Sequence, residues 1–396
     1  MNRIALMLPA LLLAACADQP SAPPSAPAGA LSSASAADGY IVVLRDGADP
    51  RAVAAAAGVN PRFVYTAAVN GFAGTLNAGQ LNALRRNPRV EYVEPDAPVQ
   101  LFTTQLAPPS WGLDRIDQRD LPLSASFTYG STGKGVNAYV LDTGVNSKHT
   151  DLYPRTSFIP NGSNGDFVGD GHGSAEDCHG HGSHVAGTIG GTSHGVAKNV
   201  WIYAGRVVNC TGGGNASMAI AGMDWIARNG KKPAVVNMSL GYGDVQSVRD
   251  AAERLVKAGF FVAAAAGNGD FAGTPQNACF QSPAGAPSVM TVGATTSTDY
   301  ESSFSNYGRC VDILAPGSSI TSLAVGSYTA TGVRSGTSMA APHVAGVAAQ
   351  YLSIVPTATP YEVTSRLDYY ATVDRIRLHS ASLSGGTPNR LLFTRF

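Results

Sequence analysis

The sequence predicts a large α/β domain, a three-layer sandwich with a mainly parallel sheet, preceded by a small α+β domain. The chain has 396 residues, which is long for a single domain, and 44% of them are hydrophobic, enough for a large core. Beyond residue 111, short apolar runs alternate with helical patterns, as in sheets covered by helices. The residues before 111 predict a different order of helices and strands.

Residues 1–16 have the pattern of an export signal, with Arg3 ahead of an apolar stretch too short to cross a bilayer. Two cleavage patterns overlap at its end. Residues 13–16 (LAAC) resemble a bacterial lipobox, in which Cys16 is acylated, whereas residues 15–17 (ACA) fit ordinary signal peptidase. We favour the lipobox because the signal is short and a cysteine follows it directly. We therefore expect a secreted protein whose precursor is lipid-anchored if Cys16 is acylated.

Residues 17–38 are rich in Pro, Ala and Ser, cannot bury a core, and are predicted to form a flexible linker. The small domain is assigned to residues 39–102. Its strands are predicted at 40–44, 63–66, 71–76 and 90–93, and its helices at 50–58 and 80–86. This β-α-β-β-α-β order fits a ferredoxin-like unit.

The large domain is assigned to residues 103–396. Strands are predicted at 136–141, 200–208, 234–240, 260–265 and 289–292, and helices at 181–189, 216–228, 245–258 and 338–354. In parallel sheets of this kind, sites form where strands end and loops begin.

Three residues at such positions predict nucleophilic catalysis. Asp142 ends an apolar strand, His181 begins a glycine-rich helix, and Ser338 begins another helix, where backbone N–H groups favour an oxyanion. A serine hydroxyl is a weak nucleophile unless a neutral histidine accepts its proton, and a carboxylate holds that histidine in one tautomer.

Five segments resemble the signature blocks of the subtilase family, in its proteinase K and aqualysin branch, from about residue 111 onward. They are AYVLDTGV, HGHGSHVAGT, VVNMSLGYG, AAAAGNGD and SGTSMAAPHVAG, and the order Asp, His, Ser is that of subtilisin. The resemblance implies a serine endopeptidase of broad specificity, with His181 as the base and His184 as a packed residue. It also implies that Asn268 donates to the oxyanion together with the Ser338 backbone N–H. Ser183 stands where the family usually has Thr.

The same resemblance implies two edge segments that clamp a peptide substrate as an added antiparallel strand. These segments are Gly212, Gly213, Gly214 and Ser239, Leu240, Gly241. Small residues at 264–267 would line the first specificity pocket, so we expect a preference for bulky apolar or aromatic residues before the cut.

Apart from Cys16, the chain has four cysteines, an even number that fits an exported protein with disulfides. Four cysteines allow three pairings, and the sequence alone does not choose among them. The resemblance implies pairing in chain order, Cys178 with Cys210 and Cys279 with Cys310.

The resemblance also implies structural calcium and no cofactor for the chemistry. One site would use Pro287, Val289 and Asp312, and a second would use Asp114, Asp117, Gln118, Ser124 and Ser126. A solvated N-terminal turn is the alternative for the second cluster. The loop at 151–178 is either a calcium loop or a simple insertion, and we favour the insertion because surface loops tolerate added length.

Residues 40–96 resemble the family's inhibitory propeptide, which acts on its own enzyme as chaperone and inhibitor. The resemblance implies a proenzyme that cuts itself near residues 102–104, and a catalytic domain with no C-terminal extension. The formal net charge is zero, which gives no reason to expect a nucleic-acid partner. We expect a monomer that acts on proteins and peptides.

Three other functions fit the sequence less well. A zinc hydrolase is suggested by the crowding of His172, His179, His181 and His184, but no HExxH is present. An esterase of the α/β-hydrolase type needs G-x-S-x-G, and Ala340 stands at the last glycine of that pattern. An inactive binding module would lack a catalytic residue, and none is missing.

Overall fold

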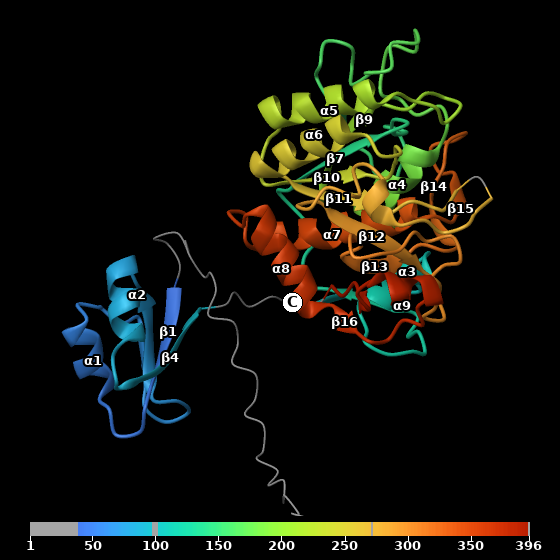
Figure 1. Ribbon diagram of the computed structural model, residues 1–396. Coiled ribbons are helices and arrows are strands. Elements are labelled where there is room, and N and C mark those ends of the chain that lie inside the picture. The colour runs from blue at the N-terminus through green and yellow to red at the C-terminus, as the bar shows by residue number, and fades with distance from the viewer. Residues whose placement is uncertain (1–38, 97–101, 271, 395–396) are drawn as a thin grey trace, which may run out of the picture. The chain divides into compact units, whose positions relative to one another are not determined.

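The computed structural model describes residues 39–96, 102–270 and 272–394 (Figure 1). The predicted export signal (1–16), Cys16 and the linker (17–38) lie outside the described residues. No helix among those described is long and apolar enough to cross a membrane. The chain divides into two compact units, Met1–Pro98 and Val99–Phe396, which we describe separately.

The N-terminal unit is an antiparallel sheet of strand order β2-β3-β1-β4 with two helices. Its elements are β1 (Gly39–Leu44), α1 (Pro50–Ala56), β2 (Phe63–Tyr65), β3 (Gly71–Thr75), α2 (Ala78–Arg85) and β4 (Val90–Pro95). Asp49 caps α1, and Asn77 and Gln80 form a capping box at α2. Val42, Phe72 and Leu84 are in its core. The predicted order of elements is confirmed.

The second unit is built on a nine-stranded sheet of order β16-β17-β13-β12-β11-β10-β7-β9-β8, parallel except at the β16–β17 pair. The sheet strands are β7 (Asn137–Asp142), β8 (Thr156–Phe158), β9 (Trp201–Arg206), β10 (Ala234–Met238), β11 (Phe261–Ala265), β12 (Met290–Thr295), β13 (Ile313–Pro316), β16 (Thr372–Val373) and β17 (Arg390–Leu391). Two antiparallel pairs accompany it, β5 (Thr103–Leu106) with β6 (Ser126–Tyr129) and β14 (Ile320–Leu323) with β15 (Thr331–Arg334).

The helices of this unit are α3 (Trp111–Ile116), α4 (His181–Gly190), α5 (Ala216–Asn229), α6 (Gln246–Lys257), α7 (Thr337–Ile354), α8 (Pro360–Tyr370) and α9 (Ser380–Gly385). Helices α5 and α6 cover one face of the sheet, and α4 and α7 lie against the other (Figure 1). Alternate residues of β7 fill the two interfaces: Ala138 and Val140 pack toward α4 and α7, and Tyr139 and Leu141 toward α5 and α6. The three-layer sandwich is confirmed.

Each strand and helix predicted for this unit is present, with ends shifted by up to three residues. The elements that were not predicted are mostly short: α3, β5, β6, β8, β13, the β14–β15 hairpin, α8, β16, α9 and β17. The carboxyl ends of β7, β10 and β11 lie at one edge of the sheet because these strands are adjacent and parallel. Residues that follow these strands therefore meet there.

Candidate active site

The structure brings Asp142 and His181 together at this edge. Asp142 is the last residue of β7 and His181 is the first of α4. The His181 Nδ1 lies 2.7 Å from Asp142 Oδ1, and the Thr143 backbone N–H donates to the same oxygen over 2.8 Å. The Asp142 side chain is 1% exposed and that of His181 is 22% exposed. A buried carboxylate therefore orients an imidazole whose Nε2 remains available for proton exchange.

The charge balance around His181 raises its pKa above the ordinary histidine value. Burial alone lowers the pKa, but the charge of Asp142 and its hydrogen bond more than offset that effect. Arg334 lowers the pKa by repulsion and Asp177 raises it. The neutral, proton-accepting form of His181 therefore predominates only at a pH above the ordinary pKa of histidine.

Asp177 fixes the loop that leads into α4, a role that the sequence analysis missed. This buried carboxylate accepts hydrogen bonds from the backbone N–H groups of His179, Gly180 and Ser183 and from the hydroxyls of Thr143 and Ser183. The Ser183 hydroxyl lies 2.6 Å from Asp177 Oδ2, so the serine supplies the bond that a threonine would supply. An Asp four residues before His181, the predicted base, was the available signal.

Ser338 is the second residue of α7, and its hydroxyl is hydrogen-bonded to Ser239. Its hydroxyl donates to the Ser239 carbonyl over 3.1 Å, and the Ser239 hydroxyl donates to the Ser338 carbonyl over 2.7 Å. Within the described residues no hydrogen bond joins Ser338 to His181. Ser239 follows β10, so the end of that strand is fastened to the start of α7.

Asn268 lies just beyond β11 with its amide oriented by Thr337. The backbone N–H and the hydroxyl of Thr337 donate to Asn268 Oδ1 over 2.8 and 2.9 Å. These two bonds identify Oδ1 as the acceptor of the Asn268 amide and leave Nδ2 as its donor. Gly336, with φ 156° and ψ 160°, has a conformation that favours glycine, and its missing Cβ would lie 3.4 Å from Asn268 Nδ2.

The other histidines near the site have separate partners. The His184 Nε2 donates to the Ile320 carbonyl over 2.9 Å, and burial lowers its pKa to about 4. His184 is thus a packed residue of α4. The rings of His179 and His181 are 6.4 Å apart, and His172 Nδ1 contacts the Ser174 carbonyl.

One group of potential metal-ligating atoms converges within the described part of the chain, and it includes His172, Cys178 and Cys210. Both cysteines are joined in a disulfide, so neither offers a thiolate to a metal.

The two segments expected to clamp substrate flank the site. Gly212–Gly214 follow β9 as exposed backbone, in a turn held by the Asn209 side chain, which accepts from the Gly213 N–H. The His179 ring lies 3.4 Å from the position of a Cβ on Gly212. Ser239–Gly241 follow β10, beside Ser338. Ala264 and Ala266 of the expected pocket lining are buried at the end of β11.

Two disulfides join Cys178 to Cys210 and Cys279 to Cys310, the pairing that the resemblance implied. The first joins the end of the loop at 151–178 to Cys210, in the segment that follows β9. Two carboxylates of that loop, Asp166 and Asp170, form ion pairs with the buried guanidinium of Arg206.

The first expected calcium site lies where β12 and β13 begin side by side. The Thr291 N–H donates to Asp312 Oδ2 over 2.7 Å, which holds this carboxylate next to the chain that follows Val289. Burial raises the pKa of Asp312 to about 7, partly offset by the Thr291 bond. An incompletely compensated carboxylate is an oxygen ligand of the kind that a hard cation prefers.

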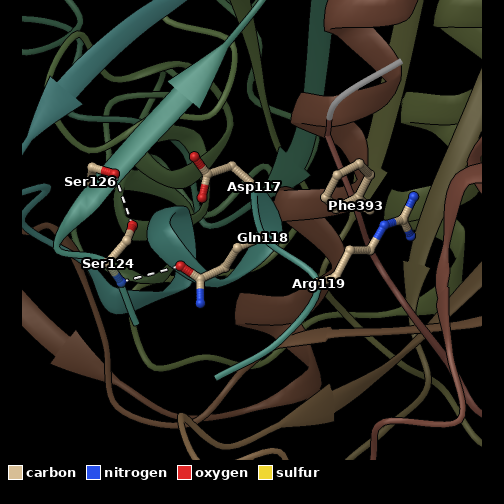
Figure 2. A pocket seen from close by; sticks show the side chains of 6 residues that line it. All are labelled: Asp117, Gln118, Arg119, Ser124, Ser126 and Phe393. Atoms are coloured by element: carbon tan, nitrogen blue, oxygen red, sulfur yellow. Dashed lines mark hydrogen bonds between the residues drawn. The ribbon is translucent and has the colours of Figure 1, made fainter. Parts of the chain in front are cut away.

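The second expected calcium site is a cavity of 360 Å³ lined by Asp117, Gln118, Ser124 and Ser126, together with Arg119 and Phe393 (Figure 2). Most of these polar groups offer oxygens, and the Arg119 guanidinium points away from them, with its carbon 3.7 Å from the Phe393 ring centroid. The fifth expected ligand, Asp114, instead accepts two bonds from Ser124. The cavity lining therefore suits a cation, but it includes only four of the five predicted ligands.

Comparison with known proteins supports the same interpretation. Residues 133–390 match the Subtilase family, and residues 51–102 match Peptidase inhibitor I9. The chain is 46% identical to an extracellular serine proteinase of Thermus sp. (strain Rt41A), over 99% of this chain and 98% of that one. It is 40% identical to the alkaline serine protease ver112 of Corniculantispora psalliotae, over 98% of each chain. A crystal structure of a cold adapted subtilisin-like serine proteinase matches with a TM-score of 0.66 and 46% identity, covering 72% of this chain and 98% of that one.

Proposed function

The chain belongs to the subtilase family of serine proteases, and on that premise we propose that Asp142, His181 and Ser338 are its catalytic triad. The observation that carries the proposal is the 2.7 Å contact between His181 Nδ1 and the buried Asp142 Oδ1. It leaves Nε2 as the acceptor for a serine proton.

In the proposed reaction the Ser338 hydroxyl turns from the Ser239 carbonyl to His181 Nε2. Catalytic hydrogen bonds are often loose before substrate binds. The Ser338 oxygen attacks the scissile carbonyl while His181 takes its proton, and Asp142 stabilises the imidazolium. Asn268 Nδ2 and the Ser338 backbone N–H stabilise the oxyanion. His181 then gives the proton to the leaving amine, and water hydrolyses the acyl-enzyme by the reverse sequence.

The substrates are proteins and peptides, cut with broad specificity outside the cell. The exposed backbone at Gly212–Gly214, and the position of Ser239–Gly241 directly after β10 with Gly241 exposed, support main-chain pairing with an extended peptide, which selects weakly for sequence. The small residues at 264–267 support a first pocket that takes bulky apolar or aromatic side chains.

We assign residues 39–102 to an inhibitory propeptide and 103–396 to the catalytic domain, with the cut near residues 102–104. Strand β5 begins at Thr103 and pairs with β6 of the catalytic unit, which supports this boundary. If Cys16 is acylated, its lipid stays with the propeptide side, and the cut releases the enzyme from the membrane.

Structural calcium is proposed at both sites described above. Asp312 would hold one ion together with the carbonyls of Pro287 and Val289, and Asp117, Gln118, Ser124 and Ser126 would hold another. A bound cation would neutralise buried carboxylate and cross-link chain segments, and so stabilise the fold without taking part in the chemistry.

The test is to express the chain from Asp18 onward and compare it with Ser338→Ala and with the matched control Ser384→Ala on casein. The wild type and the control should cut themselves near residue 103, digest casein and be silenced by a serine-directed inhibitor. Ser338→Ala should neither cut itself nor digest casein. The proposal fails if Ser338→Ala matures and digests casein at the wild-type rate.

A further inference from the structure

Arg334 carries a guanidinium whose charge acts on His181, the proposed base. It ends strand β15 and is partly buried, and its Nη2 donates to the His179 carbonyl over 3.4 Å. Among the residues that the structure describes, no carboxylate oxygen lies within 4 Å of it. The buried Arg115 and Arg206, by contrast, both form ion pairs with aspartates. An arginine at a site that binds peptides, with a single long hydrogen bond to a carbonyl, keeps donors that suit a carboxylate brought by the ligand.

The position of Arg334 is fixed relative to His181. In the β14–β15 pair it lies opposite Ile320, whose carbonyl accepts from His184 of α4. On the other side of Arg334, the Ser335 hydroxyl accepts from the Ser319 N–H over 2.8 Å. The strand end is thus fastened to the helix that begins with His181. The guanidinium reaches over the start of that helix, with Nη2 3.2 Å from the position of a Cβ on Gly180.

Arg334 lies on the side of the site that the acyl half of a substrate does not use. In the proposed mechanism, Gly212–Gly214 and Ser239–Gly241 clamp the residues before the scissile bond. The leaving amine must meet His181, because this imidazole protonates it. Residues after the bond therefore leave past the start of α4, where the guanidinium lies. Arg334 also lowers the pKa of His181, so its positive charge acts electrostatically on the imidazole that exchanges the proton.

We propose that Arg334 binds a substrate carboxylate on the leaving-group side of the scissile bond, and that the enzyme therefore favours Asp or Glu in the first two positions after the cut. The inference rests on the proposed triad. The carboxylate can come from an acidic side chain or from the free end of a short peptide, and the experiment separates these sources. A partly exposed ion pair contributes about fivefold in kcat/KM.

The test uses quenched fluorescent peptides that share the same sequence before the scissile bond and have an amidated C-terminus. They carry Glu or Gln in the first or second position after the cut. A further pair carries Gln and ends two residues after the cut, as a free acid or an amide. The enzymes are the mature wild type, Arg334→Gln, Arg334→Lys and the exposed control Arg228→Gln on α5.

The wild type and the control should cut the Glu peptide about five times faster than the Gln peptide at one position, and salt raised from about 0.05 to 1 M should remove the difference. Arg334→Gln should reduce the ratio to about one, and Arg334→Lys should keep part of it. Since Arg334 lowers the pKa of His181, Arg334→Gln should also shift the pH profile on the Gln peptide upward, which checks that the variant is folded.

If the preference is for the free acid over the amide and depends on Arg334, carboxylate binding is supported and its source is the chain end. Equal rates on all matched peptides in the wild type, or a preference that Arg334→Gln retains, overturn the inference. If the wild type cuts no peptide at all, the proposed function fails instead.

Discussion

Gly182→Ala tests whether the catalytic geometry depends on the close approach of α4 to β7. A methyl group on Gly182 would lie 2.1 Å from the Gly144 carbonyl oxygen and 3.1 Å from Asp142 Cβ. Carbon and carbonyl oxygen need about 3.3 Å between them, so the helix start must move by about 1 Å. The 2.7 Å contact between His181 Nδ1 and Asp142 Oδ1 would then lengthen beyond hydrogen-bond range.

A displacement of about 1 Å costs about 100-fold in rate. The pKa of His181 should fall at the same time, because Asp142 raises it in the wild type. The remaining activity should therefore extend to lower pH. The assay is the first-order rate of self-cleavage of the refolded precursor, followed on gels across pH, which needs no mature enzyme.

Gly243→Ala is the matched control, since no heavy atom lies within 4 Å of the Cβ that it adds. It should mature at the wild-type rate, and thermal unfolding should establish that both precursors are folded. A folded Gly182→Ala precursor that cuts itself at the wild-type rate, with an unshifted pH profile, would refute the reasoning.

Three further predictions concern single side chains. Asn268→Leu should lower kcat by about 100- to 1,000-fold with little change in KM, the magnitude known for the equivalent donor of subtilisin; a kcat within tenfold of the wild type contradicts the oxyanion role. His184→Gln should flatten the fall of the unfolding temperature between pH 6.5 and 4, measured by calorimetry in a Ser338→Ala background. Folding holds His184 neutral down to pH of about 4, so the wild type loses stability in that window as the unfolded chain takes up a proton; equal slopes in the two proteins contradict it. Calcium should raise the unfolding temperature of the wild type more at pH 8 than at pH 6, because Asp312 has a pKa of about 7 and must lose a proton to bind the ion. In Asp312→Asn this pH dependence should disappear, and its persistence would place the ion elsewhere.

Much of the fold is predictable from local pattern. The strands that end at Asp142 and Met238 are continuous apolar runs, and the helix from Thr337 follows a glycine, so their positions can be inferred within a few residues. Strand β13 (Ile313–Pro316) was missed because it has four residues and ends in proline. The β14–β15 hairpin was missed because its strands are short and of mixed polarity, and its pairing depends on contacts with α4 rather than on its own sequence.

In the candidate site, too, some residues are predictable from the local sequence and others depend on packing. Asp142, His181, Ser338 and Asn268 lie in glycine-rich segments whose residue types already indicate acyl transfer. The contributions of Asp177 and Arg334 depend on which segments meet in space. A carboxylate that accepts five hydrogen bonds, and a guanidinium with no acidic partner in the part of the chain that the structure describes, are features of packing. Nothing in their local sequence distinguishes them from surface charges.

The contact of Ser338 with Ser239 makes the identity of the nucleophile the central question. A serine-directed phosphonate should be added to the mature enzyme, which is then digested and analysed by mass spectrometry. The reagent should be found on Ser338, in one-to-one proportion with the loss of activity, and His181→Ala, matured with a trace of wild-type enzyme, should take up almost none. Loss of activity with the reagent on Ser239 or Ser183, or labelling of Ser338 at the wild-type rate in His181→Ala, would contradict the proposed mechanism.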